Sequence, residues 1–158
     1  MNSLAYSTRY VVGFIFYEEL QQVVLMKKTH PPEQAGKLNG VGGRVEIGES
    51  PVQAMVREAL EECGVQTTKD NWRQFHYERR LTLTPDQPSR TTHLYFYACA
   101  ASERHMNKVR TMTDEEVDVY HHDHRGQIGD FPMVHNLPWL IPMALDYLAS
   151  PEHRYMEG

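Results

Sequence analysis

The chain has 158 residues and a formal net charge of −5, from 16 Lys and Arg against 21 Asp and Glu. One domain accounts for this length, and a composition that is 41% apolar and 23% charged argues against wholesale disorder. A protein that binds nucleic acid through the phosphates needs a basic face. The negative net charge therefore disfavours a nucleic-acid partner. A polyanionic ligand would instead need a divalent cation as a bridge between two negative partners.

The sequence also bears on membranes and compartment. Its longest apolar stretches, residues 10–17 and 94–101, are far shorter than the ~20 residues of a membrane-spanning helix. Residues 1–6 lack the basic region and apolar core of a secretory signal. Cys63 and Cys99 have apolar neighbours, which is typical of reduced core thiols. We therefore expect a cytoplasmic protein without a membrane partner, and leave its oligomeric state open.

The first part of the chain predicts a hairpin and then a glycine-rich segment. Val, Ile, Phe and Tyr are concentrated in residues 9–17 and 22–27, which predict two strands joined by a turn at 18–21. Two prolines and a glycine mark a loop over 29–37. Four glycines within 39–48 indicate an unusual backbone path or the close approach of a ligand.

A helix is predicted from Pro51 to Cys63. Ser50 is a good N-cap, Pro51 suits the first helical position, and Gln53 completes a capping box. Gly64 is a natural residue to end the helix. The helical period predicts one buried face, made of Val52, Met55, Val56, Ala59, Leu60 and Cys63.

The rest of the chain predicts two antiparallel strands, a weaker strand and a final helix. The segments are strands at 74–83 and 93–101 around a turn at 84–88, a strand at 117–121, a loop at 126–136 and a helix at 137–149. Strands mixed with one helix in the middle and one at the end favour an α/β layered domain.

Three glutamates of the predicted 51–63 helix share a second face. Glu58, Glu61 and Glu62 are related by i, i+3 and i+4, so their charges repel one another. They also lie toward the helix C-terminus, where the helix dipole disfavours anions. A solvated acidic face is the simple interpretation of such a pattern. The alternative is a compensating cation, and carboxylate oxygens are the ligands that Mg²⁺ prefers.

The spacing of these residues resembles the Nudix box of the Nudix hydrolase family. Gly43 is followed after five residues by Glu49, and after seven more by Arg-Glu-Ala-Leu-Glu-Glu-Cys-Gly-Val at 57–65. The box thus covers residues 43–65, and the looser resemblance outside it predicts one Nudix domain over 1–158. The resemblance implies a Nudix fold, an α/β/α sandwich around a central mixed β-sheet. It also implies hydrolysis of a nucleoside diphosphate linked to another group.

The resemblance further implies roles for box residues. The Mg²⁺ or Mn²⁺ ligands that it implies are the Gly42 carbonyl and the carboxylates of Glu58, Glu61 and Glu62. Arg57 and Glu49 are implied to brace the loop and helix in support of catalysis. Either Glu58 or Glu61 could be the general base, for water activated by metal or carboxylate that attacks phosphorus in line.

Residues outside the box resemble the substrate contacts of MutT-type members. Lys27 corresponds to a basic residue that reaches phosphate, although a solubilising strand end explains it equally well. Asn39 corresponds to an amide that contacts a purine, or is a turn residue before glycine. Asn136, in an Asn-x-Pro before the final helix, resembles a bacterial residue that reads the base. Trp139 could stack on that base, although core packing at a helix start is the commoner role.

Two further segments, one acidic and one rich in histidine, contain possible metal ligands. In relatives, an acid at the place of Glu115 approaches the metals, and the alternative is a solvated acidic turn. The tract His121-His122-Asp123-His124 contains possible transition-metal ligands. An exposed histidine tract is the favoured interpretation, because no paired set of ligands accompanies it elsewhere in the sequence.

The sequence therefore predicts a Mg²⁺-dependent nucleoside triphosphate pyrophosphohydrolase of MutT type. It would release a monophosphate and pyrophosphate from a purine nucleotide, with 8-oxo-dGTP as a favoured substrate. Other Nudix substrates remain alternatives: ADP-ribose, a dinucleotide polyphosphate, NADH or a capped RNA end. A non-catalytic nucleotide-binding Nudix module is the remaining alternative, disfavoured because such modules typically lose the box glutamates.

Overall fold

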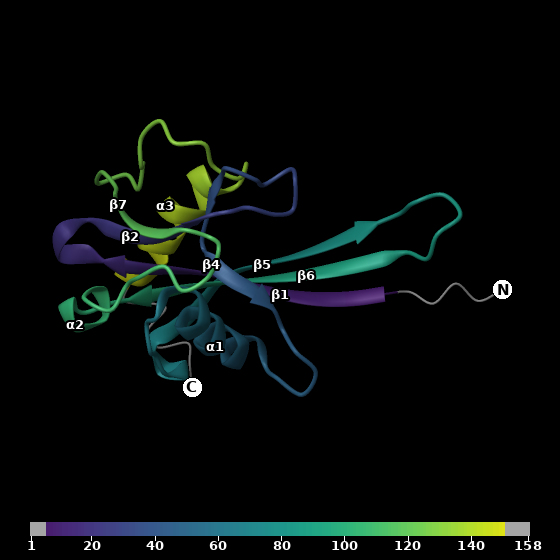
Figure 1. Cartoon of the computed structure of the whole chain (residues 1–158), viewed down its shortest axis with the longest axis horizontal. Helices are drawn as coiled ribbons and strands as arrows, with labels where there is room; N and C mark the ends of the chain where they lie inside the picture. The colour runs from purple at the N-terminus through teal and green to yellow at the C-terminus, as the bar shows by residue number, and fades with distance from the viewer. Residues whose placement is uncertain (1–5, 151–158) are drawn as a thin grey trace.

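The computed structural model describes residues 6–150, in which a mixed β-sheet lies between helices α1 and α3 (Figure 1). The strands are β1 (Tyr6–Tyr17), β2 (Gln22–Lys27), β3 (Leu38–Asn39), β4 (Val41–Arg44), β5 (Trp72–Thr82), β6 (Arg90–Ala100) and β7 (Val117–His121). The α-helices are α1 (Pro51–Cys63), α2 (Glu103–Met106) and α3 (Leu137–Ala149), and the 3₁₀ turns are η1 (Glu18–Leu20) and η2 (Lys69–Asn71). This arrangement confirms the predicted α/β/α sandwich.

Strand β1 organises the sheet. It pairs along its length with β6 in parallel, whereas the other strand pairs are antiparallel. Its opposite edge is divided, because Tyr10–Gly13 pair with β4 and Ile15–Tyr17 pair with β2. Beyond the body of the molecule, β5, β6 and the start of β1 extend as an arm (Figure 1). The divided edge of β1 brings the glycine-rich strand β4 next to α1.

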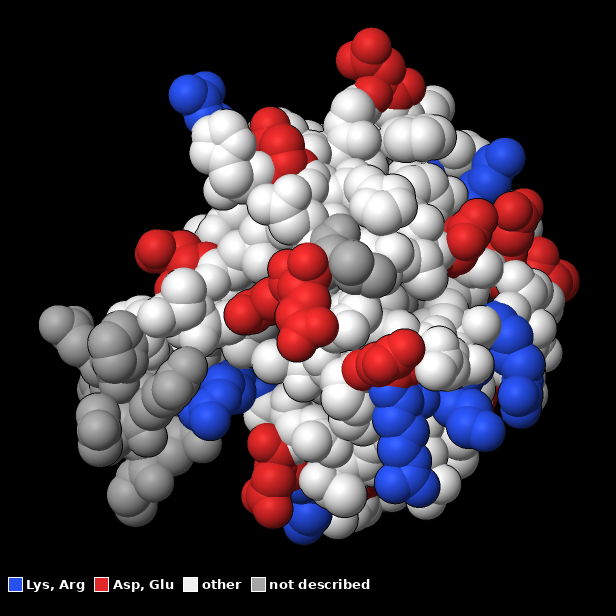
Figure 2. Space-filling model, turned by 90° about the vertical axis from the view of Figure 1, so that its left-hand side faces the viewer, with Lys and Arg blue, Asp and Glu red and all other residues white. Residues whose placement is uncertain are grey.

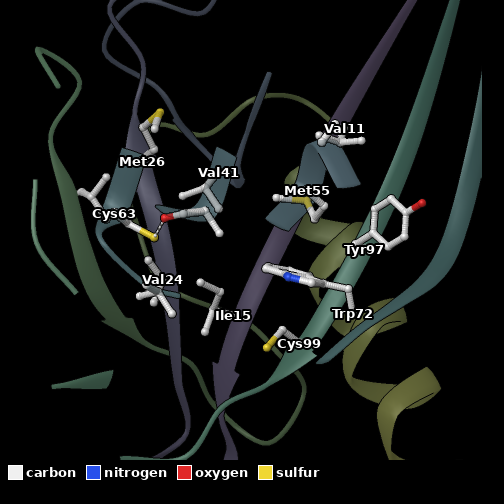
Figure 3. Packing of buried hydrophobic residues seen from close by; sticks show 14 of the residues in the cluster. Val11, Ile15, Val24, Met26, Val41, Met55, Cys63, Trp72, Tyr97 and Cys99 are labelled. Carbon is white, nitrogen blue, oxygen red and sulfur yellow. Dashed lines mark hydrogen bonds between the residues drawn. The ribbon is translucent and has the colours of Figure 1, made fainter. Parts of the chain in front are cut away.

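Each face of the sheet has its own apolar core. Met55 and Cys63 of α1 pack with Val11, Ile15 and Trp72 on one face (Figure 3). On the other face α3 contributes its own buried side chains, packed against apolar residues of β1, β2 and β6. The two cysteines are buried and unpaired, as expected for core thiols. Within residues 6–150, no helix is long and apolar enough to cross a membrane.

The predicted bounds of α1 are confirmed, and local interactions explain them. Ser50 Oγ accepts from the Gln53 N–H at 3.3 Å, and Gln53 Oε1 accepts from the Ser50 N–H at 2.8 Å. Gly64 ends the helix with φ of 73°. The predicted apolar face is wrong at Leu60, which is 47% exposed, whereas Ala54 is fully buried. The face that meets the sheet lies closer to Ala54, and Leu60 lies beyond it.

Other differences concern short or edge segments. The glycine-rich segment, expected to be irregular, forms β3 and β4 on either side of Gly40. The arm strands β5 and β6 begin two and three residues earlier than predicted, because their pairing also includes Trp72 and Arg73 of β5 and residues 90–92 of β6. The one-turn helix α2 was not predicted, since four residues carry too little periodicity. Strands β2 and β7 and helix α3 have their predicted bounds.

Candidate active site

The glycines of β4 let α1 approach the sheet closely. Glu62 Oε2 accepts a hydrogen bond from the Gly42 N–H at 2.9 Å. A Cβ atom at Gly43 would lie 2.4 Å from Glu58 Oε1, and one at Gly42 would lie 1.9 Å from the Val11 carbonyl oxygen. Neither position tolerates a side chain without movement of its neighbours. The glycines therefore seat two α1 carboxylates directly against the β4 backbone.

Arg57 ties α1 to the segment before it. Its Nε and Nη2 donate to the two carboxylate oxygens of Glu49 at 2.8 and 2.9 Å, a two-pronged ion pair. Nη2 also donates to the Arg44 carbonyl at 2.9 Å. Nη1 donates to Glu58 at 2.9 Å and to Glu61 at 3.1 Å. The guanidinium thus brings loop, helix and two candidate metal ligands together.

Burial and charge divide these glutamates into two groups. The Arg57 hydrogen bonds lower the pKa of Glu49 to about 2, so Glu49 is a stable anion. Burial raises the pKa of Glu58, and it raises that of Glu62 to about 7. For Glu62 the negative charges of Glu58 and Glu115 add to the effect. The buried Glu58 and the partly buried Glu62 both have raised pKa values, and such a pair of carboxylates is suited to receive a cation.

Glu115 joins this group from a distant part of the chain. It is 5% exposed, and its oxygens accept from Lys28 Nζ at 2.8 Å and from the Thr29 N–H at 2.7 Å. Burial alone would raise the pKa of Glu115, but these two hydrogen bonds lower it. Its charge and that of Lys28 both act on Glu62. We call Glu58, Glu62 and Glu115 the acidic cluster.

The carboxylate oxygens of the acidic cluster are suitable metal ligands, but they do not point toward one common position. Within the described residues, no three Asp, Glu, His or Cys side chains converge closely enough to hold an ion. Each carboxylate instead has a protein partner: Arg57 for Glu58, the Gly42 N–H for Glu62 and Lys28 for Glu115. Glu61, whose side chain is 55% exposed, lies at the edge of the cluster and contacts Arg57. Metal binding would require rotation of these side chains.

A cavity of about 330 Å³ on the α3 side of the sheet contains both predicted base-binding amides, and we call it the asparagine cavity. Asn39 and Asn136 line it, together with the apolar side chains of Val12, Leu94 and Phe96. Asn136 is 7% exposed, and its side chain makes no capping hydrogen bond to α3. An apolar floor with a few amides is typical of a small-molecule site.

Charged residues of this cavity were missed by the sequence analysis. They are Glu33 and Lys37 from the loop before β3, Arg80 from β5, and the neighbouring His135. Strand alternation puts Arg80 on the same face of β5 as Glu78, to which it donates at 2.6 Å. This alternation is the sequence pattern that could have predicted which face of β5 Arg80 occupies. The loop residues carry no periodic signal that would have found them.

Two of the four predicted substrate residues, Lys27 and Trp139, lie outside the asparagine cavity. Lys27 is exposed, and it is Lys28, one residue on, that faces the acidic cluster. Trp139 is 42% exposed and meets the His76 ring edge-on, with the ring centres 5.6 Å apart, so core packing is wrong for Trp139, and its stacking on a base stays a prediction. Among residues 6–150, neither Lys27 nor Trp139 lines the asparagine cavity. Successive residues at the end of β2 face opposite sides of the sheet, which is why Lys28 and not Lys27 contacts the acidic cluster, and the phosphate contact of Lys27 stays a prediction.

The histidine tract is only partly the exposed segment that was expected. His121 and His124 are exposed, but His122 is 7% exposed and meets the Phe16 ring edge-on. The Asp123 carboxylate accepts from the N–H groups of Arg125 and Gln127 and so closes a turn. The tract is a buried histidine within a turn, and the described residues form no metal-ligand group there.

Comparisons with known proteins agree with this geometry. The NUDIX domain matches residues 7–135. The 8-oxo-dGTP diphosphatase of Escherichia coli (strain K12) is 37% identical over 51 residues, which cover 32% of this chain and 40% of that protein. The chain thus matches well under half the length of this curated relative.

Solved structures show the same fold. A MutT/nudix family protein from Enterococcus faecalis matches with a TM-score of 0.66 and 19% identity, over 94% of this chain and 63% of that one. The MutT Nudix hydrolase from Burkholderia pseudomallei matches with a TM-score of 0.62 and 17% identity, over 87% of this chain and 97% of that one. With the domain match covering most of the chain, this protein belongs to the Nudix family and has the fold of MutT proteins.

Proposed function

We propose that this protein is a Mg²⁺- or Mn²⁺-dependent hydrolase that converts a purine nucleoside triphosphate into a monophosphate and pyrophosphate. One observation carries the proposal. Asn39 lines the asparagine cavity, and Gly42, three residues further on, donates to Glu62 of the acidic cluster. At a rise of about 3.3 Å per residue, they are separated by at most roughly 10 Å. A nucleotide has a comparable layout, with an aromatic base at one end and phosphates at the other.

The acidic cluster is proposed as the metal and phosphate end. Glu58, Glu62 and the Gly42 carbonyl would hold the ion, with Glu61 and Glu115 in reach as further carboxylates. A divalent ion there would polarise a phosphoryl oxygen and neutralise charge on the phosphates. Arg57 and Glu49 are positioning residues in this proposal, because their ion pair fixes the start of α1.

Proton transfer from the attacking water is assigned to a glutamate of α1. Glu58 and Glu61 are both in reach of Arg57 at the edge of the cluster. Burial raises the pKa of Glu58 above its ordinary value, the direction that suits a general base. We therefore favour Glu58 over Glu61 for this role.

The asparagine cavity is proposed as the base end. An amide donates and accepts at once, so Asn136 and Asn39 could each pair with a purine edge. Val12, Leu94 and Phe96 offer the apolar surface on which a planar base can lie. The resemblance to the 8-oxo-dGTP diphosphatase of Escherichia coli supports an oxidised guanine as the first base to test.

The test is a panel of nucleotides with and without Mg²⁺, with products separated by chromatography. The panel contains 8-oxo-dGTP, dGTP, ATP, ADP-ribose, NADH, a dinucleotide tetraphosphate and a capped RNA end. The proposal expects metal-dependent release of pyrophosphate from a purine triphosphate. Equal rates with 8-oxo-dGTP and dGTP would remove the oxidised-base assignment alone. Orthophosphate as the product, or turnover of the diphosphate-linked compounds only, would overturn the triphosphate assignment.

A further inference from the structure

A second cavity lies beyond the C-terminal end of α1, away from both parts of the proposed site. It has a volume of about 780 Å³ and lies between the segment after α1 and the segment around α2. Its charged lining residues are Arg104, Lys108 and Arg110, and His105 lies among them. No Asp or Glu of the described chain lines it. We call it the basic cavity.

The cations of the basic cavity are not neutralised within the described residues. No ion pair in residues 6–150 joins Arg104, Lys108 or Arg110 to a carboxylate, and Arg110 Nε instead donates to the Met112 sulfur at 3.0 Å. In contrast, Arg57 and Lys28 at the acidic cluster are paired. Three like charges around one hollow repel one another, and a bound anion would relieve that repulsion.

The distribution of charge on the surface at the α2 end of the molecule agrees with a local positive region. Figure 2 shows the end of the molecule on which α2 lies in Figure 1. Several Lys and Arg side chains gather at the lower right of that view, with acidic side chains above them (Figure 2). The positive charge is therefore local, on a protein whose net charge is −5.

Three backbone carbonyl groups near the C-terminal end of α1 accept hydrogen bonds, so they do not face the basic cavity as unpaired acceptors. The Leu60 carbonyl accepts from the Gly64 N–H at 3.1 Å, and the Cys63 carbonyl from the Arg110 N–H at 3.0 Å. The Glu62 carbonyl accepts from the Met112 N–H at 3.3 Å. These hydrogen bonds satisfy groups that would otherwise repel an anion at the negative end of the helix.

We propose that the basic cavity binds the polyphosphate group of a small ligand, separately from the acidic cluster. The guanidinium forks of Arg104 and Arg110 suit the oxygens of phosphate, whereas the Thr68 and Ser102 hydroxyls already form hydrogen bonds with Asn71 and His105. The volume lies in the range of small-molecule sites, roughly 300–1,000 Å³. Leu60, 47% exposed on the wall, gives a nucleoside an apolar surface to cover. The ligand class is thus a nucleotide or an inorganic polyphosphate.

The test is calorimetric titration of the full chain with inorganic tripolyphosphate and with ATP, in EDTA so that no divalent metal is present. Because the metal is absent, the result does not depend on the proposed reaction. The proposal expects saturable binding that weakens at least about tenfold in the double variant Arg104→Glu/Lys108→Glu. The neutral double variant Arg104→Gln/Lys108→Gln should fall in between. Binding should be retained in Arg79→Glu, which reverses an exposed cation on the arm, and in Glu62→Gln.

The two probes separate the possible ligands. Equal affinity for both indicates a site that recognises phosphate alone. Tighter binding of ATP that is weakened in Arg104→Glu/Lys108→Glu indicates added contact of the nucleoside with Leu60 of the same cavity. Binding of neither probe would overturn the proposal. So would binding of ATP without tripolyphosphate, binding unchanged in both double variants, or binding lost in Glu62→Gln.

Discussion

The acidic cluster and the asparagine cavity are the two polar parts of the proposed site, and they are built on opposite principles. In the cluster, burial raises the pKa of Glu62 to about 7, and the charges of Glu58 and Glu115 add to the effect. In the cavity, the two amides carry no charge and lie against apolar side chains. The first part depends on charge, so it responds to metal and pH. The second combines these amides and an apolar floor with charged residues at its wall, Glu33, Lys37 and Arg80, so it should control which nucleotide binds.

The largest effect is expected from Glu62→Gln, which removes one carboxylate of the cluster. The amide keeps the shape but loses the negative charge that would hold the cation. A metal contribution of several kcal/mol corresponds to a loss of roughly 10²–10⁴-fold in kcat/KM. Steady-state kinetics at saturating Mg²⁺ measures it, with Glu18→Gln, an exposed glutamate of η1, as the matched control. Unchanged metal-dependent turnover in Glu62→Gln would show that Glu62 is not a metal ligand.

Arg57→Ala tests whether the cluster is held in place by its surroundings. The substitution leaves Glu49, Glu58 and the Arg44 carbonyl without their shared donor. We expect a loss of about 2–3 kcal/mol in the free energy of unfolding, measured by urea denaturation. Arg57→Lys should recover only part of it, because an ammonium cannot form the two-pronged pair. A change below the error of the measurement would refute the bracing role.

In the asparagine cavity, Asn136→Ala should weaken the binding of the nucleotide. The loss of a base-edge contact is expected to raise KM for the preferred purine nucleotide about tenfold, with a smaller change in kcat. Asn107→Ala, at the exposed end of α2, is the control. If kcat falls and KM stays constant, Asn136 does not read the base.

The pH dependence of stability offers the smallest test. Glu62 has a folded pKa of about 7 against an ordinary value of 4.5, so the folded chain holds a proton that the unfolded chain releases. In metal-free buffer this group therefore costs stability as pH rises from 4.5 to 7, by roughly 1–3 kcal/mol. Glu62→Gln should be more stable than the wild type at pH 8 and equal to it near pH 4. Thermal melts at both pH values in EDTA check this, and parallel curves would contradict it.

Local signals explain which parts could be predicted from the sequence. Ser50, Gln53 and Gly64 define α1 through contacts within a few residues, so its bounds followed from the sequence. The pairing of Arg57 with Glu49 spans eight residues and also agreed with the expectation. The contacts that were missed join segments that are far apart in the sequence. Lys28 meets Glu115 across 87 positions, and Arg80 reaches the asparagine cavity from the opposite edge strand.

The central claim is that the acidic cluster, and not another part of the chain, receives the divalent ion. The most direct measurement is a Mn²⁺ titration followed by paramagnetic broadening of backbone amide signals, with Glu62→Gln in parallel. The account predicts that the amides of Gly42, Gly43 and residues 58–62 broaden first, and that the variant needs much more Mn²⁺. Broadening that begins at residues 121–124, or that is the same in the variant, would contradict it.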